Sequence, residues 1–298
     1  MRVIPKGKVI YSFNRHTPAA YTVEDGETFW VETEDGYKGQ IHSPEVLRPQ
    51  IDHSIMGCSV GPIAVTGAEP GDTLQIEVLT IQLAPQGVMV TSPGVGVLGR
   101  KITEPHTLIV PVQDGFAHFG RGLKIPVTPM IGIIGVAPAE GDHHCLWPGD
   151  HGGNMDNKLI TVGARVYLPV TLAGAGLALG DLHACMGDGE LSGTGIEIAG
   201  RVCLRVKAIK ESLGPRPLLE TREGLYTIAS APDLRTAIEV ATDDMVTLLM
   251  RKKSLGFPDA YRLMSAACDL QICQVVNKLP TVRVRAPKSG LQIASLLD

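Results

Sequence analysis

The segment Thr73–Leu83 has the sequence TLQIEVLTIQL, in which apolar and polar side chains alternate. Leu74, Ile76 and Val78 fall on one face of this segment, and a period of two residues is typical of a half-buried β-strand. The preceding residues 68–72, AEPGD, contain a Pro-Gly turn that would lead the chain into the strand. This segment therefore predicts a strand that packs one face on a hydrophobic core.

Short apolar segments separated by turn residues recur through the first two thirds of the chain. Further expected strands cover residues 107–112, 160–170 and 196–209. The last of these is divided by Ala199-Gly200, where we expect a bulge or bend. Residues 217–229 have the pattern of a hairpin that turns at 222–224. These patterns predict a mainly β fold of the sandwich or barrel type.

The pattern changes after residue 230. The spacing of apolar residues predicts a helix that begins after Asp233 and ends before Gly256. A second helix is expected over residues 258–276, and the alternation in Thr281–Arg285 predicts a late strand. We therefore expect two regions. Residues 1–230 form a mainly β catalytic region with the functional motifs, and 231–298 form an α+β portion, a helical pair plus the late strand, packed on the β core.

The composition excludes several classes of protein. Apolar residues make up 44% of the chain and charged residues 19%, whereas disordered chains are poorer in apolar residues and richer in charge. Aromatic residues are only 4%, and the isoelectric point is near 6.1. Neither a base-stacking platform nor a basic phosphate-binding surface is indicated, so we expect no nucleic-acid partner.

The ends and the cysteines indicate the compartment. The N-terminal residues MRVIPKGKVIYSFNR lack the apolar core of a signal peptide. The longest apolar stretches fall short of the roughly 18–20 residues that cross a bilayer. Six cysteines at irregular spacings, with no CxxC pair, are typical of free thiols in a reducing environment. We therefore expect a cytoplasmic protein without a membrane partner.

Residues 140–190 concentrate imidazole and acidic side chains, opposed only by Lys158 and Arg165. The histidines are His143, His144, His151 and His183, and the acids are Glu140, Asp142, Asp150, Asp156, Asp181, Asp188 and Glu190. Such side chains among glycines are the ligands that a hard-to-borderline cation requires. An acidic set of surface turns would have the same composition, so the spacing has to distinguish the two.

The spacing favours a functional site. Asp181 and His183 are two residues apart, so on a strand they share a face and could converge on one ion, or the aspartate could orient the imidazole. Asp188 and Glu190 are also two apart, in a glycine turn that could direct Glu190 toward His183. The alternative for this stretch is an ordinary Asp-Gly hairpin turn.

The stretch HGGNMD at residues 151–156 is the second group of polar residues. Its two glycines allow backbone conformations that other residues rarely adopt. His151, Asn154 and Asp156 are potential ligands or contacts to a substrate. A polar loop stabilised by local Asn and Asp turns is the alternative interpretation.

These two stretches resemble the signature sequences of the acetamidase/formamidase family. The matching segments are GPI at 61–63, GAEPGDTL at 67–74, MIGIIGVAP at 130–138, HGGNMD at 151–156, GDLHACMGDGE at 180–190 and AYRLMSAACDLQICQVV at 260–276. The resemblance thus covers nearly the whole chain. Met155 and Met186 resemble the bacterial acetamidase branch.

The resemblance implies a mainly β fold, a metal-assisted site and a homodimer or higher homo-oligomer. It implies hydrolysis of a short-chain aliphatic amide, formamide or acetamide, to ammonia and a carboxylate. Residues 34–40, EDGYKGQ, resemble an early family stretch and add Asp35 and Gln40 to the site. The chain departs from the family at residues 56–60, where MGCSV replaces an Asn-Pro-x-Thr tract. That departure affects the range of substrates more than the reaction type.

The predicted site combines both lines of argument. The predicted metal ligands are Asp35, His151, Asp156, His183 and Glu190. The predicted catalytic residues are Glu190, Asp188 and His183, and the predicted substrate-binding residues are Gln40, Gly153 and Asn154. Mixed nitrogen and oxygen ligands favour Zn²⁺, whereas a subset made only of oxygens would suit Ca²⁺.

Three mechanisms remain open from the sequence. A metal-activated water would supply the nucleophile for amide hydrolysis, with Glu190 as ligand or general base. Cys185 would share a strand face with His183 and could be a nucleophile instead, if a base or cation lowered the pKa of its thiol. The third alternative is a metal-binding protein without catalytic activity.

Overall fold

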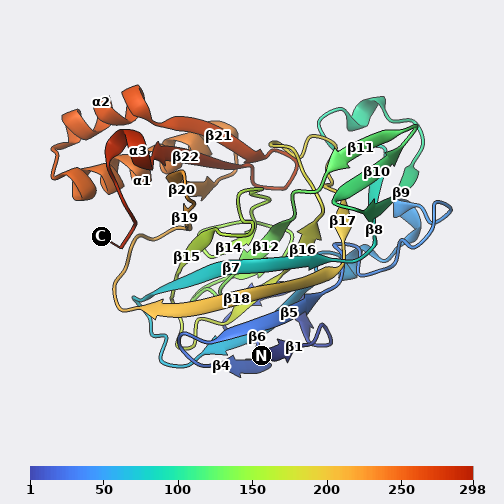
Figure 1. Cartoon of the computed structure of the whole chain (residues 1–298), viewed down its shortest axis with the longest axis horizontal. Helices are drawn as coiled ribbons and strands as arrows, with labels where there is room; N and C mark the ends of the chain where they lie inside the picture. The colour runs from blue at the N-terminus through green and yellow to red at the C-terminus, as the bar shows by residue number, and fades with distance from the viewer. Residues whose placement is uncertain (298) are drawn as a thin grey trace.

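The computed structural model describes residues 1–297, and two large sheets dominate it (Figure 1). The nine-stranded sheet has the order β1 (Arg2–Ile4), β5 (Thr28–Thr33), β18 (Gly200–Ile209), β7 (Thr73–Leu83), β15 (Arg165–Pro169), β19 (Leu218–Glu220), β20 (Gly224–Ser230), β22 (Thr281–Pro287) and β21 (Asp269–Gln274). A mainly β fold is therefore confirmed.

The eleven-stranded sheet carries most of the signature motifs. Its main path is β11 (Leu123–Pro126), β10 (Phe116–Gly120), β9 (His106–Gln113), β8 (Gln86–Thr91), β17 (Glu197–Ile198), β16 (Leu177–His183), β12 (Met130–Gly135) and β14 (Gly152–Asn154). Three further strands, β6 (Ser59–Val65), β2 (Val9–Ile10) and β4 (Tyr21–Val23), attach through the pairing of β6 with β16. A separate pair is formed by β3 (Ser12–Asn14) and β13 (Asp142–His144).

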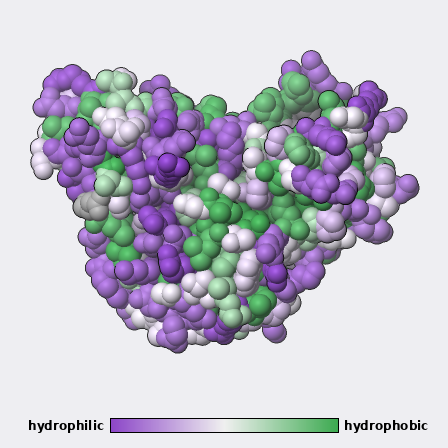
Figure 2. Space-filling model, viewed as in Figure 1, coloured by the Kyte–Doolittle hydropathy of each residue, from purple (hydrophilic) through white to green (hydrophobic). Residues whose placement is uncertain are grey.

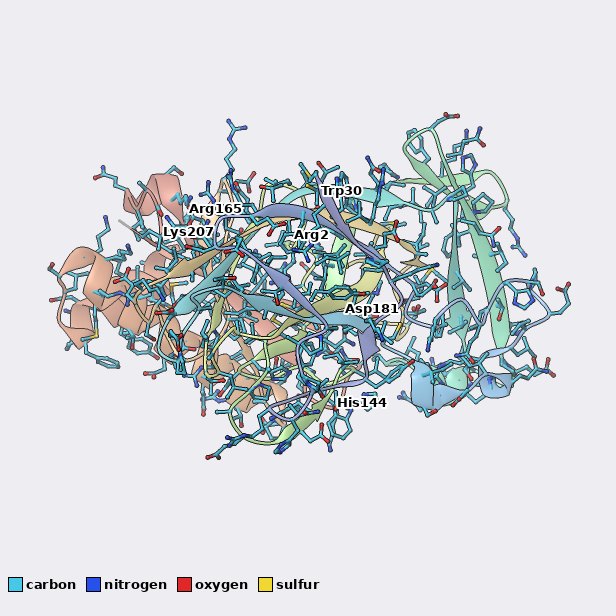
Figure 3. The ribbon with its side chains drawn as sticks, turned by 90° about the horizontal axis from the view of Figure 1, so that it is seen from below. Arg2, Trp30, His144, Arg165, Asp181 and Lys207 are labelled. Carbon is cyan, nitrogen blue, oxygen red and sulfur yellow. The ribbon has the colours of Figure 1, made fainter. Side chains whose placement is uncertain are left out.

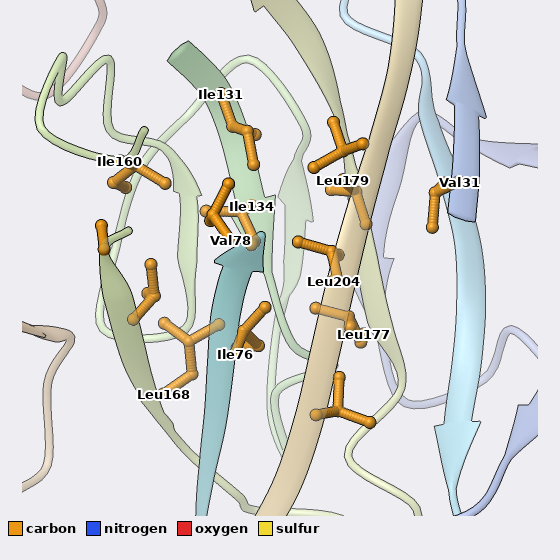
Figure 4. Packing of buried hydrophobic residues seen from close by; sticks show 14 of the residues in the cluster. Val31, Ile76, Val78, Ile131, Ile134, Ile160, Leu168, Leu177, Leu179 and Leu204 are labelled. Atoms are coloured by element: carbon orange, nitrogen blue, oxygen red, sulfur yellow. The ribbon is translucent and has the colours of Figure 1, made fainter. Parts of the chain in front are cut away.

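The main hydrophobic core lies between the two sheets. β7 has the predicted bounds, and its alternating residues Leu74, Ile76 and Val78 are fully buried. They belong to the same core cluster as apolar side chains of β12, β16 and β18, such as Ile134 and Leu204 (Figure 4). Because both faces of β16 are covered, every residue of that strand is buried, including its polar ones. The strand that carries Asp181 and His183 is thus held in the interior.

The predicted strand over 196–209 is two strands that belong to different sheets. β17 lies in the eleven-stranded sheet and β18 in the nine-stranded sheet, so the chain crosses between the sheets at Ala199-Gly200. A Cβ atom at Gly200 would lie 2.5 Å from the carbonyl oxygen of Gln82, which explains the glycine. The strand predicted over 160–170 begins only at Arg165, because hydrogen-bonded turns occupy residues 157–164.

The C-terminal portion agrees with the prediction only in part. The hairpin β19–β20 and the strand β22 are confirmed. Helix α1 (Leu234–Lys253) is capped by Asp233, whose carboxylate accepts a hydrogen bond from the backbone N–H of Thr236. Gly256 does not close this helix; it is the N-cap of α2 (Phe257–Ala267).

The second predicted helix is wrong beyond residue 267. Residues Asp269–Gln274 form β21, which pairs with β22 at the edge of the nine-stranded sheet. Leu270 is 48% exposed, whereas Cys273 is fully buried. The apolar residues of the sequence DLQICQ fit the spacing of a helix as well as the alternation of a strand. Pairing with β22 selects the strand. A short helix α3 (Lys288–Leu291) follows β22.

The helices pack on one end of the nine-stranded sheet and form a second core cluster with β20 and β22, through residues such as Leu225, Val246, Leu249 and Val284. Strands from both predicted regions thus share one sheet, and the division at residue 230 stays a prediction. Figure 2 shows the surface hollowed between this C-terminal part and the arm formed by β9, β10 and β11. In residues 1–297, no helix has the length and apolar character needed to cross a membrane.

Candidate functional site

The end of β16 and the start of β17 bring three site residues together. Asp181 and His183 share one face of β16, and Glu197 of β17 is paired directly with His183. The Nε2 atom of His183 lies 3.7 Å from Oδ2 of Asp181 and 3.2 Å from Oε1 of Glu197. Figure 3 shows Asp181 on the side of the molecule nearer the arm, away from Arg165 and Lys207. The two-residue spacing thus places the predicted pair as expected.

Two further carboxylates complete a five-residue cluster around His183. Asp156 follows β14, and Glu190 lies in the loop after β16. The ligand atoms of Asp156, His183 and Glu190 lie within 4.8 Å of one another, as do those of Asp181, His183 and Glu197. All five side chains are buried, with exposed fractions of 7% or less. His183 is common to both groups of possible ligands.

Three of the four acids have a strained backbone. The φ angles are 43° at Asp156, 59° at Asp181 and 46° at Glu190, which is the left-handed region that favours glycine. Each such residue costs on the order of 1–3 kcal/mol and persists only when the surrounding structure enforces it. Strain concentrated on residues of one cluster is typical of functional sites.

Glycines leave room for the cluster. A Cβ atom at Gly36 would lie 2.3 Å from Oδ1 of Asp181, and one at Gly195 would lie 2.4 Å from Nδ1 of His183. A Cβ atom at Gly132 would lie 2.7 Å from Oδ2 of Asp181 and also close to Asp156. The ionisable side chains therefore pack directly on backbone, where no other residue type fits without displacing them.

Three acids of the cluster, Asp181, Glu190 and Glu197, line a cavity of about 240 Å³, and Arg48 lies in the same wall. Apolar side chains form part of its wall, and Tyr37, Asn154 and Asn277 add polar groups; the apolar members are Met56, Val95, Leu146 and Val276. Several buried polar atoms of the site make no hydrogen bond among the described residues: Asn154 Oδ1, Asp156 Oδ1, Glu197 Oε2 and both ring nitrogens of His183. The Nε2 atom of His183 is close to Glu197 and Asp181, but the contact lacks hydrogen-bond geometry. Buried polar atoms are normally partnered, so these atoms indicate a ligand.

The charges of the cluster also indicate a cation. Burial raises the pKa of Asp156 to about 6 and that of Glu197 to about 8, and it raises the pKa of Glu190 well above its usual range. Burial works against a protonated His183, but Glu197 and Asp181 raise the pKa of this ring well above its usual range. Four buried carboxylates cannot all ionise beside one imidazole, and a bound cation would favour their charged forms. The donor set therefore fits a divalent cation.

Asp35 and Gln40 lie in the loop that forms one wall of the cavity. Oδ1 of Asp35 accepts hydrogen bonds from the backbone N–H groups of Tyr37 and Gly39, at 2.8 and 3.0 Å. The Gln40 side chain is bonded to the backbone of Tyr37 and Asp52. Neither residue is in the five-residue cluster, and both organise the loop that presents Gly36 and Tyr37. Their predicted roles as ligand and substrate contact stay predictions.

His151 and Gly153 lie apart from the cluster. The ring of His151 packs against Phe13 and His143, with centroid separations of 5.0 and 4.7 Å, and burial lowers its pKa to about 3. A Cβ atom at Gly153 would lie 2.9 Å from Nε2 of His151, so this glycine makes room for that ring. Asn154, the next residue, lines the cavity. Of this motif, Asn154 lines the cavity and Asp156 belongs to the cluster, whereas His151 belongs to neither, and its predicted role as a ligand stays a prediction.

Asp188 is engaged away from Glu190. Its carboxylate forms a bidentate pair with Arg283, at 2.9 and 2.8 Å, and lies 3.1 Å from Nζ of Lys158. Arg283 is almost fully buried and also donates to Gln271 and Asn157. Asp188 thus anchors the loop that carries Glu190 to β22, and its predicted catalytic role stays a prediction.

The sequence interpretation missed several residues. Glu197 is an acid inside the apolar segment GIEIAG, and a charged residue in a buried strand was the signal that could have identified it. Asn277, Tyr37 and the three glycines carry no comparable local signal. The spacing predicts that Asp181 lies beside His183, where it would share an ion with the imidazole or orient it, but Asp181 is not among the five predicted ligands.

Cys185 lies beside the cluster, in the wall of a second, more apolar cavity of about 570 Å³ that Glu190 also lines. The side chain is half-buried, and burial raises the pKa of its thiol. A thiol with a raised pKa is mostly protonated at neutral pH, which makes it a poor nucleophile. This environment does not favour the cysteine mechanism.

Comparison with known proteins identifies the family. The chain is similar to an acetamidase of known crystal structure from Bacillus halodurans, with a TM-score of 0.95, 40% identity and coverage of 97% of this chain and 98% of that one. It is 30% identical to an acetamidase of Mycolicibacterium smegmatis over 65% of this chain and 64% of that protein. It is 28% identical to a formamidase of Methylophilus methylotrophus over 70% of this chain and 65% of that protein.

The matches to such curated relatives span 63% to 65% of their length. The model of the acetamidase/formamidase family matches residues 8–146 and 139–286, which together make up most of the chain. This chain therefore belongs to the acetamidase/formamidase family.

Proposed function

We propose that this protein is an amidohydrolase that cleaves a short-chain aliphatic amide, formamide or acetamide, to ammonia and a carboxylate with a metal-activated water. The observation that carries the proposal is the buried cluster of one imidazole and four carboxylates with unpartnered ligand atoms in a small cavity. The similar proteins named acetamidase and formamidase support the same reaction.

His183, Asp156, Asp181 and Glu197 are the proposed ligands of a divalent cation, and Glu190 is either a further ligand or the general base. Asp156 and Glu190 form one group with His183, and Asp181 and Glu197 form the other. The mixture of imidazole and carboxylate favours Zn²⁺, and the high share of oxygens leaves Ca²⁺ as the alternative. When bound, such a cation lowers the pKa of a water molecule and polarises the amide carbonyl.

The remaining chemistry falls to side chains of the cavity. Glu190 lies at its wall with a raised pKa, which suits a group that takes a proton from the attacking water and delivers it to the leaving amine. The unpartnered Oδ1 of Asn154 is suited to accept a hydrogen bond from the amide N–H₂ group of the substrate. The hydroxyl of Tyr37, whose pKa is raised by burial, stays protonated; it donates to Thr194 over a long 3.4 Å and can exchange this bond for one to the substrate oxygen.

The size of the cavity supports a short acyl group. Its volume of about 240 Å³ is below the roughly 300–1,000 Å³ of sites for drug-sized ligands. The apolar side chains of Met56, Leu146 and Val276 in its wall would contact a methyl group. We therefore expect activity to fall as the acyl chain lengthens from acetamide to butyramide.

The test of the proposal is ammonia release from formamide, acetamide and propionamide, combined with elemental analysis of protein purified without an affinity metal. We expect near-stoichiometric metal, loss of activity with a chelator, and recovery on addition of Zn²⁺ or Ca²⁺. An active protein without metal would exclude the cation, and a metal-loaded protein without amidase activity would favour the non-catalytic alternative.

The role of Glu190 has its own test. Glu190→Gln should lower kcat by on the order of 10²–10⁴, the usual contribution of a general acid–base. Glu104→Gln is the matched control, because Glu104 is exposed and lies outside the cavity. Equal activity of the two variants would exclude Glu190 from the chemistry.

We also propose that the protein acts in the cytoplasm as a homodimer or larger homo-oligomer. Six free cysteines support a reducing compartment. The exposed apolar residues Phe116, Leu123 and Ile125 on the arm, up to 60% exposed, support burial against a second copy. Light scattering after size-exclusion chromatography tests the assembly, and a monomer at micromolar concentration would exclude it.

A further inference from the structure

The connection between β21 and β22 reaches the site from the far end of the chain. Nδ2 of Asn277 donates a hydrogen bond to Oδ2 of Asp156 at 2.7 Å and another to the backbone oxygen of Asn154 at 3.1 Å. Both acceptors belong to the HGGNMD motif, and Asn277 also lines the cavity. One amide thus contacts the side chain of a proposed ligand and the backbone that carries it.

The two oxygens of Asp156 have different surroundings as a result. Oδ2 is held by Asn277, whereas Oδ1 is buried and has no hydrogen-bond partner within residues 1–297. Glu197 has the same arrangement, since its Oε1 accepts from Thr194 at 2.9 Å and its Oε2 has no partner there. A carboxylate with one oxygen fixed by a donor cannot rotate freely, so its other oxygen keeps one direction.

Asn277 is itself held in place. The side chain of Gln274 is fully buried, and its Oε1 accepts from the backbone N–H groups of Val276 and Asn277, both at 2.9 Å. Nε2 of Gln274 donates to the backbone oxygen of Leu279 at 2.7 Å and to Thr281 at 2.9 Å. These bonds fix the turn that carries Asn277.

The hairpin formed by β21 and β22 is also hydrogen-bonded to the loop that carries Glu190. The backbone N–H of Gly189 donates to the oxygen of Cys273 at 2.8 Å, and the N–H of Val275 donates to the oxygen of Gly189 at 3.2 Å. The pair of Arg283 with Asp188 lies beside these bonds. The hairpin therefore holds Asp156 through Asn277 and the loop of Glu190 through its backbone.

We infer that Asn277 is a positioning residue that orients Asp156, so that the β21–β22 connection completes a site whose five ionisable residues come from the eleven-stranded sheet and its loops. The inference rests on the proposed function, in which Asp156 is a ligand of a divalent cation. Asn277 acts through Asp156, and its loss should weaken cation binding without unfolding the protein.

The experiment measures the Zn²⁺ affinity of the metal-free full-length protein by competition with a chelating dye. Asn277→Ala should bind Zn²⁺ about 10–100-fold more weakly, as expected when a partner of a ligand is removed. Asn277→Leu lacks the hydrogen-bond donor but nearly keeps the side-chain volume, so it should lose the same Zn²⁺ affinity. It replaces Asn277→Ala in the experiment if the alanine variant is unstable. The melting temperature of each metal-free variant should stay within a few degrees of the unmodified protein.

Asn14→Ala is the matched control. The amide of Asn14 also donates to an aspartate, Asp142, but this pair lies between β3 and β13, outside the cluster. Its Zn²⁺ affinity should equal that of the unmodified protein. The inference would be overturned if both Asn277 variants kept a Zn²⁺ affinity within threefold of the unmodified protein, or if Asn14→Ala lost as much affinity as they do. Either result would leave the proposed cation site standing. An unmodified protein that binds no Zn²⁺ and no Ca²⁺ would overturn the proposed cation site and this inference with it.

Discussion

His183 and His151 are both buried, with exposed fractions of 0% and 5%, and both have unpartnered ring nitrogens among the described residues. Their neighbours differ. His183 lies between the carboxylates of Asp181 and Glu197, which raise its pKa, whereas His151 packs against Phe13 and another imidazole, and its pKa is lowered to about 3. Burial removes solvent from both rings, and only His183 has carboxylates beside it that could share a cation with the ring.

The difference shows why residue type and motif do not suffice to assign a ligand. Both histidines lie in family signatures, and both were predicted as ligands. Only His183 lies on a strand whose neighbours supply carboxylates on the same face. A buried imidazole beside aromatic rings contributes packing, and the neutral form is the one that its surroundings stabilise.

The sharpest test exchanges each ring for an uncharged amide. His183→Gln should lose bound metal and lower kcat/KM by at least the order of 10²–10⁴ that acid–base or ligand groups contribute. His151→Gln should retain its metal and stay within tenfold of the unmodified protein. The comparison breaks down if elemental analysis finds the metal lost from His151→Gln and kept in His183→Gln.

A smaller effect is expected from the backbone that supports His183. The Cβ atom of Gly195→Ala would lie 2.4 Å from Nδ1 of His183, so the ring must move. We expect metal affinity and kcat to fall about 10–100-fold, as when a group that positions a ligand is disturbed. Gly7→Ala is the control, because a Cβ atom there would have no neighbour within 4 Å. Unchanged affinity of Gly195→Ala would mean that the close packing around His183 is not needed.

The pKa of His151 predicts a pH effect on stability. Its pKa is near 6.5 in the unfolded chain and about 3 in the folded protein, so on acidification the unfolded state takes up the proton first. Folding free energy from this ring is therefore fully present above pH 6.5 and is lost as the pH falls toward 3, with a loss on the order of 1 kcal/mol already at pH 5.5.

Urea unfolding of metal-free protein at pH 7.5 and pH 5.5 measures the contribution of His151 to the free energy of unfolding. The unmodified protein should lose more stability between the two values than His151→Gln, and the difference between the two losses isolates the ring. Equal losses would show that His151 titrates normally, and the contrast with His183 would then lose its electrostatic basis.

The smallest effect is expected at Cys185. Cys185→Ala should stay within tenfold of the unmodified protein, which corresponds to less than about 1.4 kcal/mol in the activation barrier. Steady-state kinetics with acetamide, together with metal content, provide the measurement. An inactive Cys185→Ala with its metal intact, and an acyl-thioester trapped on the unmodified protein, would replace the proposed mechanism with a cysteine nucleophile.

Much of this protein follows from the sequence alone. The alternation in Thr73–Leu83 and in residues 281–285 predicts strands because a period of two places alternate side chains on one face, which is a local property. The Asp181–His183 pair follows from the same period. The polar motifs at 151–156 and 180–190 suffice to indicate the family and to locate four residues of the cluster, Asp156, Asp181, His183 and Glu190.

Only the tertiary structure decided the rest. Residues 269–274 satisfy both helical and strand periods, and pairing with β22 selected the strand. Glu197 joins His183 through register between neighbouring strands, and Asn277 reaches Asp156 across more than a hundred residues of chain. Register, sheet order and the close approach of backbone to side chains depend on contacts between distant segments, and no local pattern of residues encodes such contacts. For that reason the sequence could nominate His151, but only the fold could place it among aromatic rings.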